Sequence, residues 1–305
     1  MEYIAEVKFN NYEANIIMDE AQLRAFVAIN RFGSFTAAAD NLHLTQPAIS
    51  KRIAALETQL GAALFDRIGR SARLTETGHK LLPLAENLLL SFNNLRQSAD
   101  NLKQQVSGGL SLGTSHHVGL HRLPPILRQY TIQYPDVELA LRFVDSEDGV
   151  RGVESGELEM AIITLPAITT GSISATCVWD DPLSLVVGKM HALADRDVID
   201  VEELADHEAI LPGINTYTRS LLEEKLTLTG YKLRVGLSTN YLETNKMMAS
   251  IGLGWTILPE TMLDGSVKKI AIRNITLRRE LGYVTHNDMT LSNATKAMIG
   301  LLDSI

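Results

Sequence analysis

The clearest pattern of apolar and polar positions predicts two short helices joined by a tight turn, followed by a basic hairpin, within residues 34–73. Ser34 precedes the first helix and can cap it by accepting a hydrogen bond from a free backbone N–H. His43 and Leu44 turn the chain, and Thr45 offers the second N-cap. The apolar residues of the second helix recur at i, i+4 and i+7 and are expected to face a core: Ile49, Ile53 and Leu56.

The outward face of this second helix suits contact with nucleic acid. It carries Gln46, Ser50 and Lys51, and residues 41–56 contain no Asp or Glu. Amide, hydroxyl and cationic groups without acids match phosphates and base edges. Arginines then surround Gly69, as expected of a basic wing that reaches a DNA backbone or minor groove: Arg67, Arg70 and Arg73. The pattern predicts a DNA-reading helix, and the alternative is a small helical bundle whose charges are simply solvated.

A long heptad pattern follows after Thr75, another plausible N-cap. Its apolar positions recur with the spacing 4-3-4-3-4-3-4: Leu81, Ala85, Leu88, Phe92, Leu95, Ala99, Leu102 and Val106. This is the 3.5-residue repeat of a coiled coil, although one amphipathic helix of a globular domain would also carry an apolar stripe. We predict a linker helix over residues 76–107, ended by Ser107-Gly108-Gly109 as a hinge, that pairs two chains through Leu81, Leu88, Phe92, Leu95 and Leu102.

From residue 110 onward, strand-like and helix-like segments alternate. The predicted strands are 110–115, 137–144, 159–164, 182–188 and 209–212. The predicted helices are 121–135, 148–157, 218–230, 241–252 and 293–305. This order predicts an α/β fold with a mainly parallel sheet and helices on both faces.

Hydroxyl-rich turns in this α/β part indicate a ligand site. Ligands of open α/β sheets bind beyond the carboxyl ends of strands, near helix N-termini. Residues 113–117, Thr164 and residues 215–218 occupy such places, and we expect them to converge on one small molecule. Free N–H groups and the helix dipole there favour an anionic group such as a carboxylate.

The order SFTAAADNLHLTQPAISKRIAALETQLGAALFDR, followed by RLTETG, resembles the winged helix-turn-helix of LysR-type transcriptional regulators. The resemblance continues over roughly residues 18–305. In that family the helix that opens with Thr-Gln-Pro enters the major groove. The resemblance therefore implies DNA contacts from this helix, its flanking turns and the wing: Ser34, Thr36, Thr45, Gln46, Pro47, Ser50, Lys51, Arg52, Arg67 and Arg70.

The resemblance also implies a C-terminal effector domain that looks like a periplasmic solute-binding protein, with a cleft between two α/β subdomains. The residues that it places at the effector are Ser115, His116, His117, Thr164, Thr216 and Asn240. The competing interpretation is that each hydroxyl caps a helix. Glu159 departs from the Asp that is common in the family just before this strand.

Charge is distributed unevenly along the 305 residues, which carry a net charge of −8. Residues 18–105 hold 10 Lys/Arg against 8 Asp/Glu, residues 1–17 hold one Lys against three Glu, and the remainder carries the other acids. The basic character is therefore local, as in a DNA-reading head on an acidic body, and DNA affinity should depend on salt.

Other classes of site find little support. The single Cys177 excludes an internal disulfide and a cysteine-cluster metal site, and we predict that it is buried on a strand. His116, His117 and His121 lack an accompanying Cys or carboxylate motif, so no metal and no cofactor are expected. Ser115 beside His116 lacks a Gly-x-Ser-x-Gly elbow, and no convergent acid/base pair is evident. An enzyme is therefore not expected.

We accordingly predict a sequence-specific transcriptional regulator controlled by a small-molecule effector, with a cytoplasmic solute-binding module without DNA function as the alternative. The N-terminus is no secretory signal and no apolar run approaches the roughly 20 residues of a membrane span, so a cytoplasmic location is expected. The expected partners are an interrupted inverted repeat in double-stranded DNA, a small polar or anionic metabolite, a second copy in a homodimer or homotetramer, and RNA polymerase. The predicted domains are an extension (1–17), a winged helix-turn-helix (18–75), the linker helix (76–107) and an effector domain (108–305). Within the effector domain we expect subdomain I at about 108–182 and 282–305, and subdomain II at about 183–281.

Overall fold

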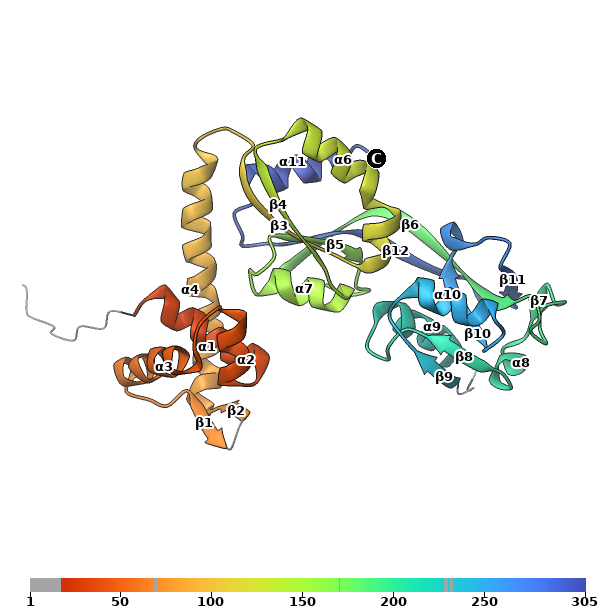
Figure 1. Cartoon of the computed structure of the whole chain (residues 1–305), viewed down its shortest axis with the longest axis horizontal. Coiled ribbons are helices and arrows are strands. Elements are labelled where there is room, and N and C mark those ends of the chain that lie inside the picture. Colours follow the sequence, from red (N-terminus) through yellow and green to blue (C-terminus); the bar gives the residue numbers. More distant parts are fainter. Residues whose placement is uncertain (1–17, 69–70, 170, 228–229, 231–232) are drawn as a thin grey trace, which may run out of the picture. The chain divides into compact units, whose positions relative to one another are not determined.

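The computed structural model describes residues 18–68, 71–169, 171–227, 230 and 233–305, so the predicted extension at 1–17 lies outside it. The chain divides into two compact units between Phe92 and Asn93 (Figure 1). The boundary falls inside the long helix α4, which begins in the first unit and ends in the second. Among the described residues, no helix combines the length and the apolar character needed to cross a membrane.

The first unit is a winged helix-turn-helix. Its elements are α1 (Glu20–Phe32), α2 (Phe35–Asn41), α3 (Gln46–Leu60), β1 (Phe65–Ile68), β2 (Ser71–Leu74) and the start of α4 (Glu76–Asn101). The predicted caps are present: Ser34 Oγ accepts from the backbone N–H of Ala37 at 3.0 Å, and Thr75 Oγ1 accepts from that of Gly78 at 2.9 Å. The strands β1 and β2 pair as an antiparallel hairpin, which is the predicted wing.

Helix α4 ends at Asn101, earlier than the predicted 107. The Asn101 side chain donates to the carbonyl of Leu291 at 2.9 Å and accepts from the backbone N–H of Asn293 at 3.0 Å. The chain then turns, and Gln104 adopts a left-handed φ of 54°. Gly108 and Gly109 consequently open a strand, where we had expected them to end the helix. The heptad pattern ran past the helix because tertiary hydrogen bonds, which a repeat does not encode, stop it.

The second unit contains two α/β lobes joined by long strands. Lobe I holds β3 (Gly108–Thr114), α5 (His116–His121), α6 (Leu123–Gln133), β4 (Val137–Phe143), α7 (Ser146–Glu154), β5 (Met160–Thr164) and α11 (Asn293–Leu302). Lobe II holds β7 (Val198–Ile199), α8 (Val201–Ala205), β8 (Glu208–Leu211), α9 (Tyr217–Thr227), β9 (Arg234–Ser238), α10 (Leu242–Ser250), β10 (Trp255–Pro259), η1 (Glu260–Met262) and β11 (Val267–Ile272). The strands β6 (Ile173–Gly188) and β12 (Leu277–His286) run through both lobes (Figure 1).

The strand order β4-β3-β5-β12-β6-β10-β8-β9 corrects the expectation of a mainly parallel sheet. Pairing is parallel within each lobe, as between β3 and β4 or β8 and β9. It is antiparallel wherever β6 or β12 takes part, including the pair that they form with each other. These strands return the chain from one lobe to the other, so they run against their neighbours.

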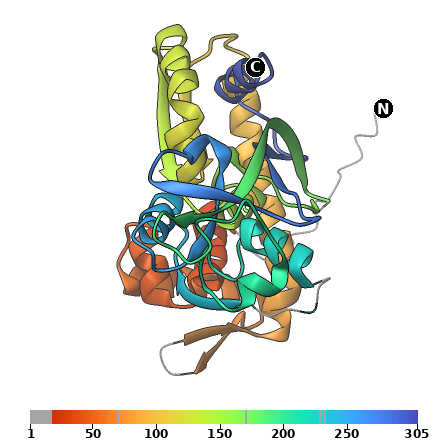
Figure 2. The ribbon, with the colours of Figure 1, turned by 90° about the vertical axis from the view of Figure 1, so that its right-hand side faces the viewer.

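Each lobe is layered, with helices on both faces of its strands. In lobe I, α6 and α11 lie side by side on one face, and α7 covers the other (Figures 1 and 2). In lobe II, α8 and α9 pack on the larger core, and α10 packs on the opposite face. The lobes therefore have separate hydrophobic cores, and polar groups are free to meet between them.

Cys177 lies on β6, but it is exposed, so the prediction of burial is wrong. The pairing of β6 with β12 shifts register between Leu281 and Gly282, beside Cys177. Its neighbours Val178 and Trp179 occupy the positions that pack against the lobe I core. The small thiol is therefore left on the solvent side of a strand that passes between two cores.

Candidate functional site

Helix α3 is oriented by its buried apolar residues. The predicted residues Ile49, Ile53 and Leu56 are all fully buried in the core of the first unit. Thr45 caps the helix by accepting from the backbone N–H of Ala48 at 3.4 Å, and Pro47 occupies the first turn, where it displaces no hydrogen bond. The opposite face of α3 is therefore held toward solvent.

That outward face carries the residues predicted to read DNA. Gln46, Pro47 and Lys51 are exposed, and Ser50 accepts a 3.0 Å hydrogen bond from the Gln46 amide. Arg52 is half-buried, while Thr36 on α2 is exposed. A face of amide, hydroxyl and cation is suited to base edges and phosphates.

The remaining DNA-binding candidates are placed as follows. Ser34 and Thr45 serve as helix caps, so their hydroxyls already have a structural use. Arg67 lies on β1 opposite Ala72, and the predicted wing residue Arg70 lies outside the described residues. Their contacts with DNA stay predictions.

All of the predicted effector residues line one cavity between the lobes. Ser115, His116 and His117 begin α5, and Thr164 ends β5, all in lobe I. Thr216 precedes α9 and Asn240 follows β9, both in lobe II. In this arrangement of the lobes the cavity is small, with a volume of about 60 Å³.

Polar contacts close the cavity from both sides. The Asn240 amide in lobe II donates to Asp145 Oδ2 in lobe I at 2.7 Å. The backbone N–H of Tyr217 in lobe II donates to Glu147 Oε1 in lobe I at 2.5 Å. Burial raises the pKa of the Glu147 carboxyl, and the hydrogen bond from Tyr217 only partly opposes this. Both acids therefore have partners across the cavity.

The competing interpretation of the hydroxyls as helix caps is right for one residue and wrong for another. Thr216 Oγ1 donates to the Gly213 carbonyl at 2.8 Å and accepts from the backbone N–H of Arg219, so it shapes the start of α9. Ser115 occupies the N-cap position of α5 but makes no capping hydrogen bond. Its buried Oγ has no partner among the described residues, so it is available to a ligand.

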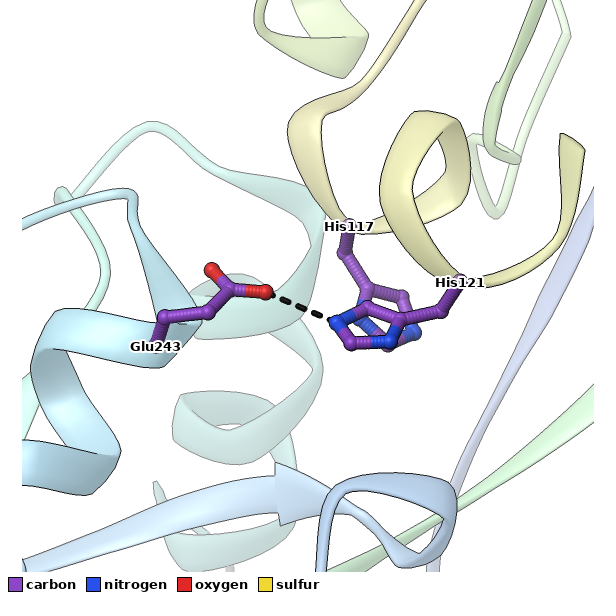
Figure 3. A group of neighbouring side chains, drawn as sticks. All are labelled: His117, His121 and Glu243. Carbon is purple, nitrogen blue, oxygen red and sulfur yellow. Dashed lines mark hydrogen bonds and ion pairs between the residues drawn. The ribbon is translucent and has the colours of Figure 1, made fainter. Parts of the chain in front are cut away.

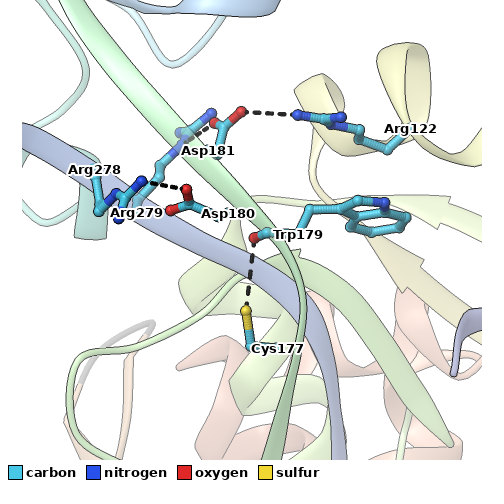
Figure 4. Close-up of polar contacts among 7 residues, drawn as sticks. All are labelled: Arg122, Cys177, Trp179, Asp180, Asp181, Arg278 and Arg279. Carbon is cyan, nitrogen blue, oxygen red and sulfur yellow. Dashed lines mark hydrogen bonds and ion pairs between the residues drawn. The ribbon is translucent and has the colours of Figure 1, made fainter. Parts of the chain in front are cut away.

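Arg279 is a lining residue that sequence reasoning missed. It is 8% exposed and lies on β12 directly opposite Asp181 of β6. Its Nε donates to Asp181 Oδ2 at 2.8 Å and its Nη1 to Thr218 Oγ1 at 2.7 Å, while its Nη2 has no partner among the described residues. Asp181, fully buried, also accepts from Arg122 at 3.3 Å (Figure 4). The sequence did contain an indication of this role. At the start of β12 buried and exposed positions alternate, and Arg279 occupies a buried position between Leu277 and Leu281.

His117 is the second buried polar group of the cavity. It is 6% exposed, and neither of its ring nitrogens has a hydrogen-bond partner among the described residues. Burial lowers its pKa to about 3, and the positive charge of Arg279 adds to the effect. His117 is therefore a neutral imidazole near pH 7, with one donor and one acceptor nitrogen.

Three donor side chains gather at this edge of the cavity. His121 Nε2 lies 2.9 Å from Glu243 Oε1, and Glu243 belongs to α10 of lobe II (Figure 3). His117 completes the group, and donor atoms of the three side chains lie within 4.8 Å of one another. The sequence alone did not indicate this group, because Glu243 is more than a hundred residues from both histidines.

Comparisons with known proteins agree with this architecture. The model of the family described as LysR substrate binding domain matches residues 103–304, and that of bacterial regulatory helix-turn-helix protein, lysR family, matches residues 21–79. A probable RuBisCO transcriptional regulator from Synechocystis sp. is 31% identical over 288 residues, covering 91% of this chain and 84% of the relative.

Solved structures show the same fold. A full-length OxyR variant from Pseudomonas aeruginosa has a TM-score of 0.67 at 23% identity, covering 93% of this chain and 94% of that one. Full-length CbnR in complex with its target DNA has a TM-score of 0.56 at 19% identity, covering 94% of this chain and 99% of that one. The chain therefore belongs to the LysR family, and it is a transcriptional regulator with a helix-turn-helix DNA-binding domain and an effector-binding domain.

Proposed function

We propose that the effector of this regulator is a small metabolite with a carboxylate or similar anionic group, bound in the cavity between the lobes. The observation that carries the proposal is the Nη2 of Arg279, a buried cationic donor that lines the cavity and has no hydrogen-bond partner among the described residues. A guanidinium nitrogen has no acceptor function, so its partner must be an acceptor. A carboxylate oxygen supplies the strongest such hydrogen bond.

The other cavity groups support the same ligand class. Ser115 Oγ and the nitrogens of His117 are buried and unpaired among the described residues, and they suit further polar atoms of the ligand. The acids Asp145 and Glu147 are already bonded across the cavity, so their repulsion of an anion is reduced. A ligand that left these buried groups unpaired would lose affinity, because an unmade buried hydrogen bond costs about 1–3 kcal/mol.

We also propose that α3 reads the operator through Gln46, Pro47, Ser50, Lys51 and Arg52. Ser34, Thr36, Thr45, Arg67 and Arg70 complete the proposed DNA-facing set. Affinity supplied by phosphate contacts would decrease with rising salt concentration.

The proposed homodimer pairs through α4. Leu88, Phe92 and Leu95 are 45%, 38% and 71% exposed along this helix, an apolar stripe that a second copy would cover. Leu81 instead packs against the core of its own unit, and Leu102 lies beyond the helix end. Two paired heads would read an interrupted inverted repeat, because operator symmetry mirrors protein symmetry. A homotetramer, a cytoplasmic location and contact with RNA polymerase complete the proposal.

The ligand class is tested by a thermal-shift screen of the full chain. Carboxylate metabolites are compared with their neutral amide analogues, and we expect only the acids to raise the melting temperature. Ser115→Ala should weaken the response, whereas Ser304→Ala, at the exposed C-terminal end, should not. Equal stabilisation by acids and amides, or an unchanged response in Ser115→Ala, would contradict the assignment.

Control of DNA binding is a second measurement on the same protein. Footprinting on the DNA around its own gene should show protection of an inverted repeat. The extent of the protected region should change when the ligand is added. A ligand shifts a conformational equilibrium only by its difference in affinity between the states. If a tightly bound acid left the footprint unchanged at every concentration, it would not be the effector.

A further inference from the structure

The effector proposal uses His117 but neither His121 nor Glu243, and the donor atoms of these three side chains form one group. The two histidines project from successive turns of α5 in lobe I, at the spacing i, i+4 that places side chains on one helix face. Glu243 comes from α10 in lobe II and points toward them (Figure 3). Among the described residues, this is the group of three His, Cys or acidic side chains whose donor atoms converge.

Independent evidence for a ligand comes from the state of His117. It is more than nine-tenths buried, faces the other two side chains, and has no hydrogen-bond partner on either ring nitrogen among the described residues. Buried polar groups in native proteins are normally paired, so an unpaired one indicates a missing partner. The second oxygen of Glu243 also lacks a hydrogen-bond partner within the part of the chain that the structure describes. Its neighbour there is His116 Nδ1, at 3.7 Å.

Two imidazoles and one carboxylate form a donor set that transition metals prefer. Zinc is bound by His nitrogen and by Glu oxygen at about 2.0–2.2 Å, and three protein ligands with an open fourth position are common. Donors around a tetrahedral zinc lie roughly 3.3–3.5 Å apart at these bond lengths. Since the donor atoms here lie within 4.8 Å of one another, side-chain movements of roughly an ångström bring them to coordinating distance.

Nearby charges set a limit on the affinity. Arg279 and Arg122 are close enough to affect His117, and both would repel a metal cation. Each of them is bound to the buried Asp181, which offsets part of this repulsion. Glu243 brings one negative charge directly to the site, so the balance permits binding that depends on this carboxylate.

We propose that His117, His121 and Glu243 bind a divalent first-row transition metal of the Zn²⁺ class. The metal would take ligands from both lobes, so it would hold the lobes together at the edge of the cavity. The metal would share His117 with the proposed effector cavity, whereas Arg279 and Ser115, which carry the carboxylate proposal, take no part in the metal site. A failure to bind metal would therefore leave the proposed carboxylate contacts unaffected.

The test is calorimetric titration of Zn²⁺ into the full chain, purified without a polyhistidine tag and freed of metal. We expect one Zn²⁺ to bind per chain. When Co²⁺ replaces Zn²⁺, the visible absorption spectrum should indicate a metal ion of low coordination number. His121→Gln and Glu243→Gln should each weaken binding by about tenfold or more, because loss of even an outer hydrogen bond costs about 10–100-fold in metal affinity. The variants' melting temperatures without metal establish that they are folded.

The matched control is His207→Gln, because His207 and His191 form the other close histidine pair of this unit, with ring centroids 4.9 Å apart. Binding should be unchanged in this variant. The proposal is overturned by any of three results: no saturable Zn²⁺ binding, retention of full affinity in both His121→Gln and Glu243→Gln, or loss of affinity in His207→Gln. If His121→Gln does not fold, the zinc affinity of Glu243→Gln alone decides the test. This variant should fold because Glu243 is partly exposed.

Discussion

The buried pair of Arg279 and Asp181 gives the sharpest quantitative prediction. The two residues face each other across β12 and β6, where these strands pass between the lobes. Arg279→Met retains most of the side-chain length but removes the guanidinium. Asp181, which is fully buried, then keeps Arg122 at 3.3 Å as its charged partner, and Thr218 loses its hydrogen bond to the guanidinium.

The expected loss follows from these contacts. Removing one partner of a buried ion pair costs about 3–5 kcal/mol, because the other charge is left uncompensated. The remaining bond to Arg122 reduces this cost, and the lost Thr218 contact adds to it. We therefore expect a loss of about 3 kcal/mol in the free energy of unfolding of the effector domain. For a domain of this size that is a decrease of about 6–12 °C in melting temperature.

The assay is urea unfolding followed by tryptophan fluorescence. Both tryptophans, Trp179 and Trp255, lie in the effector domain, so the signal reports that domain within the full chain. The matched control is Arg278→Met. The Arg278 side chain, which pairs with Asp180, is more than half exposed, so its ion pair should contribute at most about 1 kcal/mol to stability.

A double-mutant cycle identifies the cause of the loss. In Arg279→Met/Asp181→Leu both charges are absent, so the double variant should be more stable than the sum of the single losses by about 2 kcal/mol or more. Strictly additive losses, or a loss for Arg279→Met no greater than for Arg278→Met, would refute the account of a desolvated pair.

Other substitutions test other parts of the molecule. Leu95→Asp places a charge on the exposed stripe of α4 and should convert the proposed homodimer to monomer, as measured by sedimentation; an unchanged mass would remove α4 as the interface. Lys51→Ala should weaken DNA binding and reduce the slope of log affinity against log salt by about 1 if Lys51 contacts a phosphate, and an unchanged slope would exclude that contact. Gly78→Ala should destabilise the DNA-binding unit by about 1–3 kcal/mol, because the added Cβ would lie 2.3 Å from the Leu64 carbonyl oxygen. In the control Gly300→Ala the added Cβ meets open space, so thermal melts should show this helix stabilised by about 0.5–1 kcal/mol. Glu147→Gln keeps the acceptor for Tyr217 and removes a carboxyl whose pKa is raised in the folded state. The free energy of unfolding of the wild type should therefore fall as pH rises through the carboxyl range. Urea titrations should show the stability of the variant increasing relative to that of the wild type over the same range.

The parts that were predictable from sequence are those with local causes. The caps at Ser34, Thr45 and Thr75 and the buried triad of α3 follow from hydrogen bonds and spacings within a few residues. The convergence of the predicted effector residues on one cavity followed from the sequence because strand ends in α/β sheets meet at a common edge. The end of α4 was not, since the hydrogen bonds of Asn101 that stop it reach residues near 290.

The parts that sequence reasoning missed depend on pairings between distant segments. Arg279 acquires its role from Asp181, which lies 98 positions earlier in the chain, and Glu243 joins the histidines of α5 only after two lobes have formed. Cys177 was predicted to be buried from its residue type, but it is exposed beside a register shift in the pairing of β6 with β12. Alternation along β12 did carry one usable signal, because an arginine on the buried phase of a strand requires a charged partner.

The contacts that close the cavity indicate how a modest ligand could control the regulator. Polar contacts between the lobes join Asn240 to Asp145, Tyr217 to Glu147, and His121 to Glu243, and all of them are partly open to water. Hydrogen bonds and ion pairs of this kind contribute about 0–1.5 kcal/mol each, because water competes for the same groups. Their sum is of the same order as the roughly 1–3 kcal/mol of a typical allosteric coupling. The lobe cores, by contrast, are separate clusters, although the Tyr217 side chain of lobe II packs against a core of lobe I. An anion that binds Arg279 and Ser115 in one arrangement of the lobes therefore needs only a small preference for it to shift the population, and β6 and β12 are the segments that would carry the change.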